Sequence, residues 1–180
     1  DCEEILLRYD SESFTTVIIR PATVCGYSPR QRLDVVVNIF ANLAYRKREI
    51  SIFGGKQLRP NIHISDMADA YLAILSADKN KVSGKIYNTG YENQSVVELA
   101  ETVKSVFGDD VRLITTATND NRSYHISSAR ISAELGYRAR RTIQDAVVDL
   151  FNAFEGGLLP NSLTDERYFN IERMRSINLL

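Results

Sequence analysis

The chain has 180 residues, of which 44% are hydrophobic and 25% charged, and these values are typical of one soluble globular domain. A net charge of −1 gives no overall field that would favour nucleic acid or an anionic membrane. Apolar runs such as 35–37 are far too short to cross a bilayer. The 2 cysteines lack disulfide-framework or metal-ligand spacing, so we expect a reduced, cytoplasmic protein without a metal.

The first quarter of the chain predicts two helices and a strand. Residues 1–9 have the pattern of an amphipathic helix tail, with no initiator methionine before it, so we expect a piece of something longer. Residues 15–20 are β-branched and apolar, which predicts a strand covered on both faces. After a loop at 26–30, helical spacing over 32–48 predicts a helix that ends on cations.

Short strands and a helix follow in the middle of the chain. The pattern predicts strands at 50–53, 62–64 and 85–88, the first and last of which are ended by glycine. Ser65 is predicted to cap a helix that runs to Ala77.

Two capping boxes predict the later helices. One pairs Ser95 with Glu98 and the other pairs Thr142 with Asp145, each before an apolar helical pattern that ends at glycine. Between the boxes we expect a strand at 111–114, a polar stretch and a short helix at 128–135, and we expect the less periodic tail from Leu158 to wrap the surface. Alternating short strands and helices predict an α/β class and a single domain.

Sequence motifs give little support to self-contained catalysis. The chain has no GxGxxG, GxxxxGK[ST], GxSxG or HExxH pattern, and neither of its 2 histidines lies near a cysteine. His63 alternates with apolar residues, which favours a hydrogen-bonded structural histidine. We therefore predict no catalytic residue and no metal ligand.

Arginines and small polar residues at loop mouths are the remaining candidates. A guanidinium at Arg59, after a Gly-Gly turn, could clamp a diphosphate, although residue type alone favours a solvated or structural arginine. Thr23 lies just beyond the carboxyl end of a strand, where ligands bind in open α/β sheets, so its hydroxyl could contact a ligand. Alternatively, the hydroxyl bonds to the backbone of its own turn. Residues 122–124 either grip a nucleotide or solvate a loop. Arg30 and Arg32 flank a helix start and give only weak evidence for an anion site.

Four segments in register carry a resemblance to a known family. They are IRPATVCG at 19–26, RPNIHISDMA at 59–68, IYNTG at 86–90 followed by SVVELA at 95–100, and SARISAELGY at 128–137. In this order they resemble the second half of NAD-dependent nucleotide-sugar epimerases and dehydratases, in the extended short-chain dehydrogenase/reductase family. The resemblance implies the C-terminal part of an extended Rossmann-type fold.

The resemblance also implies roles for individual residues. The cofactor-facing residues would be Pro21, Ala22 and Thr23, and the substrate-facing residues would be Thr23, Arg32, Leu33, Arg59, Asp120 and Arg122. Among these, Arg59 matches the arginine that binds the substrate diphosphate. Thr23 stands where asparagine is usual.

The Gly-rich loop and the Tyr-Lys pair of that family have no counterpart here. We therefore expect residues 1–180 to be a single substrate-binding portion whose dinucleotide-binding half is absent. The implied partners are NAD or NADP, a nucleotide-diphosphate sugar and that other half, in a parent enzyme that forms a homodimer. The alternatives are a non-catalytic module that binds a nucleotide sugar or a partner, and a reductase acting on a non-sugar substrate.

Overall fold

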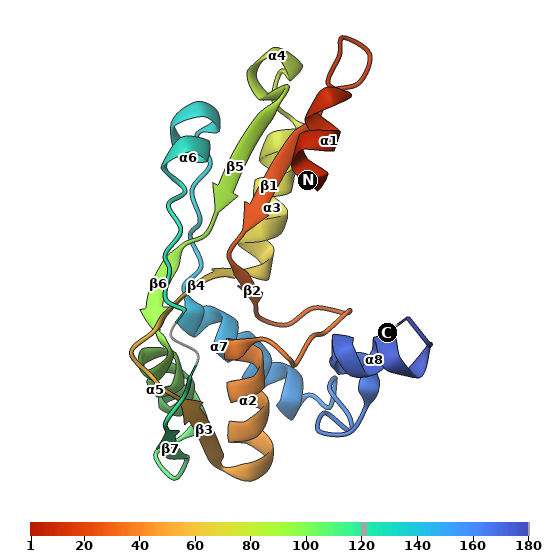
Figure 1. Ribbon diagram of the computed structural model, residues 1–180. Helices are drawn as coiled ribbons and strands as arrows, with labels where there is room; N and C mark the ends of the chain where they lie inside the picture. Colours follow the sequence, from red (N-terminus) through yellow and green to blue (C-terminus); the bar gives the residue numbers. More distant parts are fainter. Residues whose placement is uncertain (120–121, 180) are drawn as a thin grey trace.

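Three small sheets organise the part of the chain that the computed structural model describes, residues 1–119 and 122–179 (Figure 1). In the first sheet, β1 (Val17–Pro21) pairs in parallel with β5 (Lys85–Thr89). In the second sheet, β4 (Leu58–His63) lies between β2 (Thr23–Cys25), which is parallel to it, and β6 (Glu92–Ser95), which is antiparallel. In the third sheet, β3 (Glu49–Phe53) pairs in parallel with β7 (Arg112–Thr116). The predicted α/β class is confirmed.

Helices cover these sheets in two groups. They are α1 (Cys2–Arg8), α2 (Val36–Lys47), α3 (Ile64–Leu75), α4 (Lys79–Val82), α5 (Val96–Phe107), α6 (Ala129–Leu135), α7 (Ile143–Glu155) and α8 (Asn170–Ser176), with a 3₁₀ turn η1 at Glu166–Tyr168. In Figure 1, α1, α3, α4 and α6 surround β1 and β5, whereas α2, α5 and α7 lie in the lower part with β3 and β7. The sheet of β2, β4 and β6 joins the two parts.

Each part has its own apolar core. The lower core is formed largely by α2, α5 and α7, where Val37, Leu99 and Leu150 are fully buried. The upper core packs α3 and α6 around Ile62, Tyr87 and other buried side chains. No helix within the described ranges, 1–119 and 122–179, combines the length and apolar character needed to span a bilayer. The two predicted capping boxes are both present.

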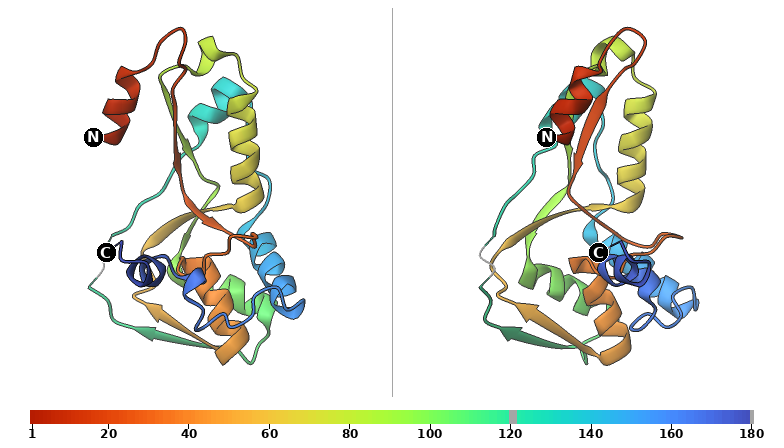
Figure 2. Two further views of the ribbon diagram at one scale, coloured as in Figure 1. Left: turned by 90° about the vertical axis from the view of Figure 1, so that its right-hand side faces the viewer. Right: turned by 45° about the vertical axis from the view of Figure 1, so that its right-hand side comes forward.

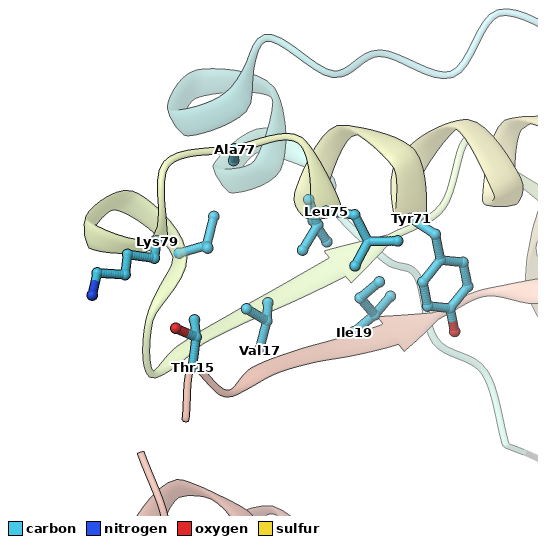
Figure 3. Close-up of a pocket in the computed structure, with 9 residues that line it drawn as sticks. Thr15, Val17, Ile19, Tyr71, Leu75, Ala77 and Lys79 are labelled. Atoms are coloured by element: carbon cyan, nitrogen blue, oxygen red, sulfur yellow. The ribbon is translucent and has the colours of Figure 1, made fainter. Parts of the chain in front are cut away.

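The strand predicted at 15–20 forms as β1, but the prediction that both of its faces are covered is wrong. Arg20 and Pro21 are exposed, and Val17 and Ile19 are only half-buried. Within the described residues β1 pairs along one edge only, with β5. A cavity lies between β1 and α3, so Val17 and Ile19 pack only in part against the upper core (Figure 3).

Several boundaries differ from prediction because tertiary contacts set them. His63, not Ser65, caps α3: its Nδ1 accepts from the backbone nitrogen of Ser65 at 3.1 Å. The helix predicted from residue 32 begins at Val36, because the side chains of Gln31 and Asn38 hold residues 26–35 in an irregular loop. Strands β2 and β6 and helices α4 and α8 were not predicted.

Candidate functional site

A cavity of about 340 Å³ lies where β1 passes into β2, and one of its walls is the predicted cofactor-facing segment, Pro21 to Thr23. The backbone nitrogen of Ala22 donates to the carbonyl oxygen of Thr89 at 2.7 Å, which holds the crossing between the two strands. Arg32 lines the same cavity from the opposite loop. Four of the predicted site residues are therefore brought to one cavity.

Gly26 forms part of this cavity in a conformation that favours glycine. Its φ is +104°, and a Cβ atom there would lie 3.3 Å from Cγ2 of Ile64 and 3.6 Å from Nε2 of His63. Its backbone nitrogen donates to Oδ1 of Asn38 at 3.1 Å. The turn thus lets the chain lie close against the start of α3 and lead into the next loop.

Residues 26–35, the pocket loop, are held by two buried amide side chains. The Gln31 side chain accepts from the nitrogen of Ser28 at 3.0 Å and donates to the carbonyls of Gly26 at 3.3 Å and Arg32 at 3.0 Å. Asn38 also donates to the Arg32 carbonyl, at 2.8 Å. Sequence reasoning missed both amides; the only signal was Asn38, a polar residue within the apolar run that starts α2.

Leu33 lies in the pocket loop, but its side chain is fully buried in the lower core. Its backbone nitrogen donates to the carbonyl oxygen of Tyr168 at 2.8 Å. The side chain therefore offers no surface to the cavity, in contrast to the substrate-facing role that the resemblance implies for this residue.

A second cavity, of about 410 Å³, is lined by Arg59, Arg122, Ser123 and Tyr124. The Arg59 guanidinium donates to the Leu58 carbonyl at 3.0 Å and to the Arg122 carbonyl, and it lies 6.0 Å from the centroid of the Tyr124 ring. Ser123 accepts from the backbone nitrogen of Leu58 at 3.0 Å. Residues 122–124, left open between a nucleotide grip and a solvated loop, thus lie directly against Arg59. The predicted site residue Asp120 lies outside the described residues.

The two cavities share one sheet. Thr23 on β2 is in register with Asn61 on β4, and Arg59 is two residues earlier on the same strand, about 7 Å along it. Asn61 is fully buried; its Nδ2 donates to the Arg59 carbonyl at 2.8 Å, and its Oδ1 has no hydrogen-bond partner among residues 1–119 and 122–179. Thr23 and Arg59, one from each cavity, therefore lie on neighbouring strands of this sheet.

The interpretation of His63 as a hydrogen-bonded structural histidine is confirmed. Because Nδ1 accepts from the α3 backbone, Nε2 carries the proton that it donates to Asp149 Oδ2 at 3.1 Å. The ring is 2% exposed and uses both nitrogens to join β4, α3 and α7. His63 therefore has no free nitrogen with which to act as a base.

The Cys25 thiol lies beside the first cavity but is closed to reagents. The residue is 1% exposed, its Sγ donates to the Ile62 carbonyl at 3.5 Å, and burial raises its pKa to about 12. Since the thiolate is the reactive species, we expect a thiol reagent at pH 8 to label only exposed Cys2 in the folded chain. A spectrophotometric titration should count one thiol before denaturant and two after it; two rapid thiols in the folded chain would contradict this burial.

Solved structures share this arrangement over most of the chain. RMD from Pseudomonas aeruginosa, complexed with NADPH, has a TM-score of 0.75 at 19% identity, covering 86% of this chain and 54% of its own. UDP-glucuronic acid 4-epimerase from Bacillus cereus, in complex with UDP-glucuronic acid and NAD, has a TM-score of 0.69 at 22% identity, covering 80% and 46%. The chain thus has the α/β fold found in part of Rossmann-type epimerases and dehydratases.

Sequence comparison finds similarity to the same group of enzymes. Residues 2–90 match the sequence model of the NAD dependent epimerase/dehydratase family. UDP-glucose 4-epimerase 2 from Arabidopsis thaliana is 28% identical over 160 residues, which cover 82% of this chain and 45% of the relative. The resemblance to this family that the motifs predicted is therefore confirmed, and the chain spans about half the length of the curated relatives it matches.

Proposed function

We propose that this chain is the substrate-binding portion of a cytoplasmic NAD- or NADP-dependent enzyme that epimerises or dehydrates a nucleotide-diphosphate sugar. The observation that carries the proposal is the placement of Arg59. Its guanidinium is held by neighbouring carbonyls beside Arg122, Ser123 and Tyr124, on β4, the strand that pairs with β2 at the wall of the first cavity.

Arg59 would bind the diphosphate of this ligand. A planar guanidinium can donate to two phosphate oxygens at once. Its hydrogen bonds to the Leu58 and Arg122 carbonyls already restrict the side-chain rotamers of Arg59, so binding costs less conformational entropy. The half-exposed ring of Tyr124 would offer a stacking face to the base. The sugar would then extend toward Thr23 in the first cavity.

The first cavity fits the reactive end of a dinucleotide rather than the whole cofactor. Its wall at Pro21 and Ala22 is apolar and lies at the carboxyl end of β1, where ligands of open α/β sheets bind. When bound, NAD or NADP accepts and returns a hydride. The 180 residues contain no Gly-rich phosphate loop, so we assign the rest of the dinucleotide to a separate dinucleotide-binding half.

The open edge of β1 supports docking of that half. An apolar cavity of about 500 Å³ lies between β1 and α3, with Val17 and Ile19 facing Tyr71 and Leu75 (Figure 3). Leu75 is 79% exposed, and Figure 2 shows α1 and α3 standing apart on either side of the strand. Because a parallel sheet is normally covered on both faces and an exposed apolar edge favours pairing, this surface suits an added parallel strand with its helix.

Ligand titration of the isotope-labelled chain tests the proposal. We expect UDP-glucose and UDP to shift the amide resonances of Arg59, Ser123 and Tyr124, with Thr23 shifting more for UDP-glucose. Glucose alone should shift none of them, because it lacks the diphosphate. Saturable shifts confined to other surfaces, or none with UDP-glucose at millimolar concentration, would contradict the proposal. Turnover of UDP-glucose by this chain alone would contradict the need for a second half.

A further inference from the structure

The C-terminal strap, residues 158–176, crosses the molecule beside the pocket loop (Figures 1 and 2). Leu159 and Tyr168 anchor it in the lower core, where they are 2% and 8% exposed. Ser162 exchanges hydrogen bonds with Asn42 of α2, accepting at its carbonyl and donating from its hydroxyl at 2.8 and 2.7 Å. The strap is therefore part of the packed fold.

Beyond these anchors the strap bonds to the pocket loop in three ways. The carbonyl of Tyr168 accepts from the nitrogen of Leu33 at 2.8 Å. The nitrogen of Asn170 donates to Asp34 Oδ2 at 2.9 Å. The Arg30 guanidinium donates to the carbonyl of Arg167 at 3.3 Å and to Asn170 Oδ1 at 3.1 Å.

These contacts give Arg30 a different charge environment from its neighbour Arg32. The Nε of Arg32 pairs with Asp34 at 2.9 Å, which partly neutralises it. Within residues 1–119 and 122–179, the hydrogen-bond acceptors of Arg30 are neutral amide oxygens, those of Gln31, Arg167 and Asn170. Among the residues that the structure describes, no aspartate or glutamate lines the cavity that Arg30 borders.

We propose that the C-terminal strap positions Arg30 to bind an oxyanion of the ligand in the first cavity, with Asn170 as a positioning residue that acts through Arg30. An oriented, exposed guanidinium without a carboxylate partner is suited to a charge-assisted bond with an incoming anion. The inference rests on the proposed function for the kind of ligand. The oxyanion is either the diphosphate, which Arg30 would then share with Arg59, or a carboxylate on the sugar.

A double-mutant cycle tests this role. Arg30→Ala, Asn170→Ala and the double variant are titrated calorimetrically with UDP, UDP-glucose and UDP-glucuronic acid. We expect Arg30→Ala to weaken binding about 10-fold and Asn170→Ala about 3-fold, with the double variant no weaker than Arg30→Ala, because the two residues act as one unit. Glu172→Ala on the exposed surface of α8 is the control and should leave every Kd unchanged. Loss with all three ligands identifies the diphosphate; loss with UDP-glucuronic acid alone identifies the sugar carboxylate.

Amide hydrogen exchange tests the strap independently of any ligand. Asn170→Ala should speed exchange at Leu33, whereas Glu172→Ala should not. Equal exchange in both variants, unchanged Kd values in Arg30→Ala, or additive losses in the double variant would overturn the inference while leaving the proposed function standing. If the unaltered chain binds none of the three probes, the proposed function fails, and with it the ligand role of Arg30.

Discussion

Replacing Asp66 by alanine is expected to lower the free energy of unfolding by about 3 kcal/mol, the scale of removing a buried charged acceptor from its hydrogen-bond donors. Asp66 is 1% exposed. Its Oδ2 accepts from the backbone nitrogens of Arg140 at 2.9 Å and Arg141 at 2.7 Å, and its Oδ1 accepts from the Arg141 guanidinium at 2.6 Å. Alanine would leave the two backbone nitrogens without this acceptor, whereas the Arg141 guanidinium, 42% exposed, would keep its bond to Asp69.

The expected loss of stability is large because Asp66 joins parts of the upper core that are distant in sequence. It lies in the first turn of α3, and its backbone carbonyl accepts from the Tyr137 hydroxyl at 2.7 Å. Together these bonds fix residues 137–141, which lead into α7. Its loss should therefore loosen the approach to α7 as well as α3.

Urea unfolding followed by circular dichroism measures the effect, and Asp69→Ala is the matched control. Asp69 pairs with the same Arg141 guanidinium at 2.9 Å but is 51% exposed, so its loss should cost less than about 1 kcal/mol. Similar losses for the two variants would show that burial does not decide the strength of this pairing.

Replacing Arg59 by alanine is expected to weaken UDP-glucose binding about 30- to 100-fold, the scale of charge-assisted hydrogen bonds to a diphosphate. The Leu58 and Arg122 carbonyls hold the guanidinium in place against the Tyr124 ring. The side chain therefore loses little conformational entropy when it binds the ligand. Calorimetric titration of the chain gives the Kd directly. Fold integrity is checked by comparing urea midpoints.

Two further variants separate charge from geometry at this position. Arg59→Lys keeps the charge but loses the planar fork, so we expect a partial loss of affinity. Arg112→Ala removes an exposed arginine of β7 that pairs with Glu49 at 2.6 Å, outside both cavities, and should leave the Kd unaltered. An unaltered Kd in Arg59→Ala would remove Arg59 from the site and would withdraw the main support for the proposed function.

Local pattern by itself determined the elements whose stabilising bonds are short in sequence. The capping boxes at Ser95 and Thr142 were predictable because each joins residues three positions apart. The helical spacing of apolar residues in α5 and α7 also indicated which face of each helix packs against the core. The motif around Arg59 likewise pointed to a site because it lies within one strand and its flanking turn. The order of these motifs was enough to indicate the family.

Tertiary structure alone decided which of these residues meet. Leu33 was expected to face a ligand but is buried, because the helix after it, α2, packs on α5 and α7. His63 caps α3 in place of Ser65, because its ring is held between the α3 backbone and Asp149. Arg30 owes its orientation to a carbonyl 137 positions away in the chain. Such contacts leave no periodic trace in the sequence, since each one depends on the path of the whole chain between its two ends.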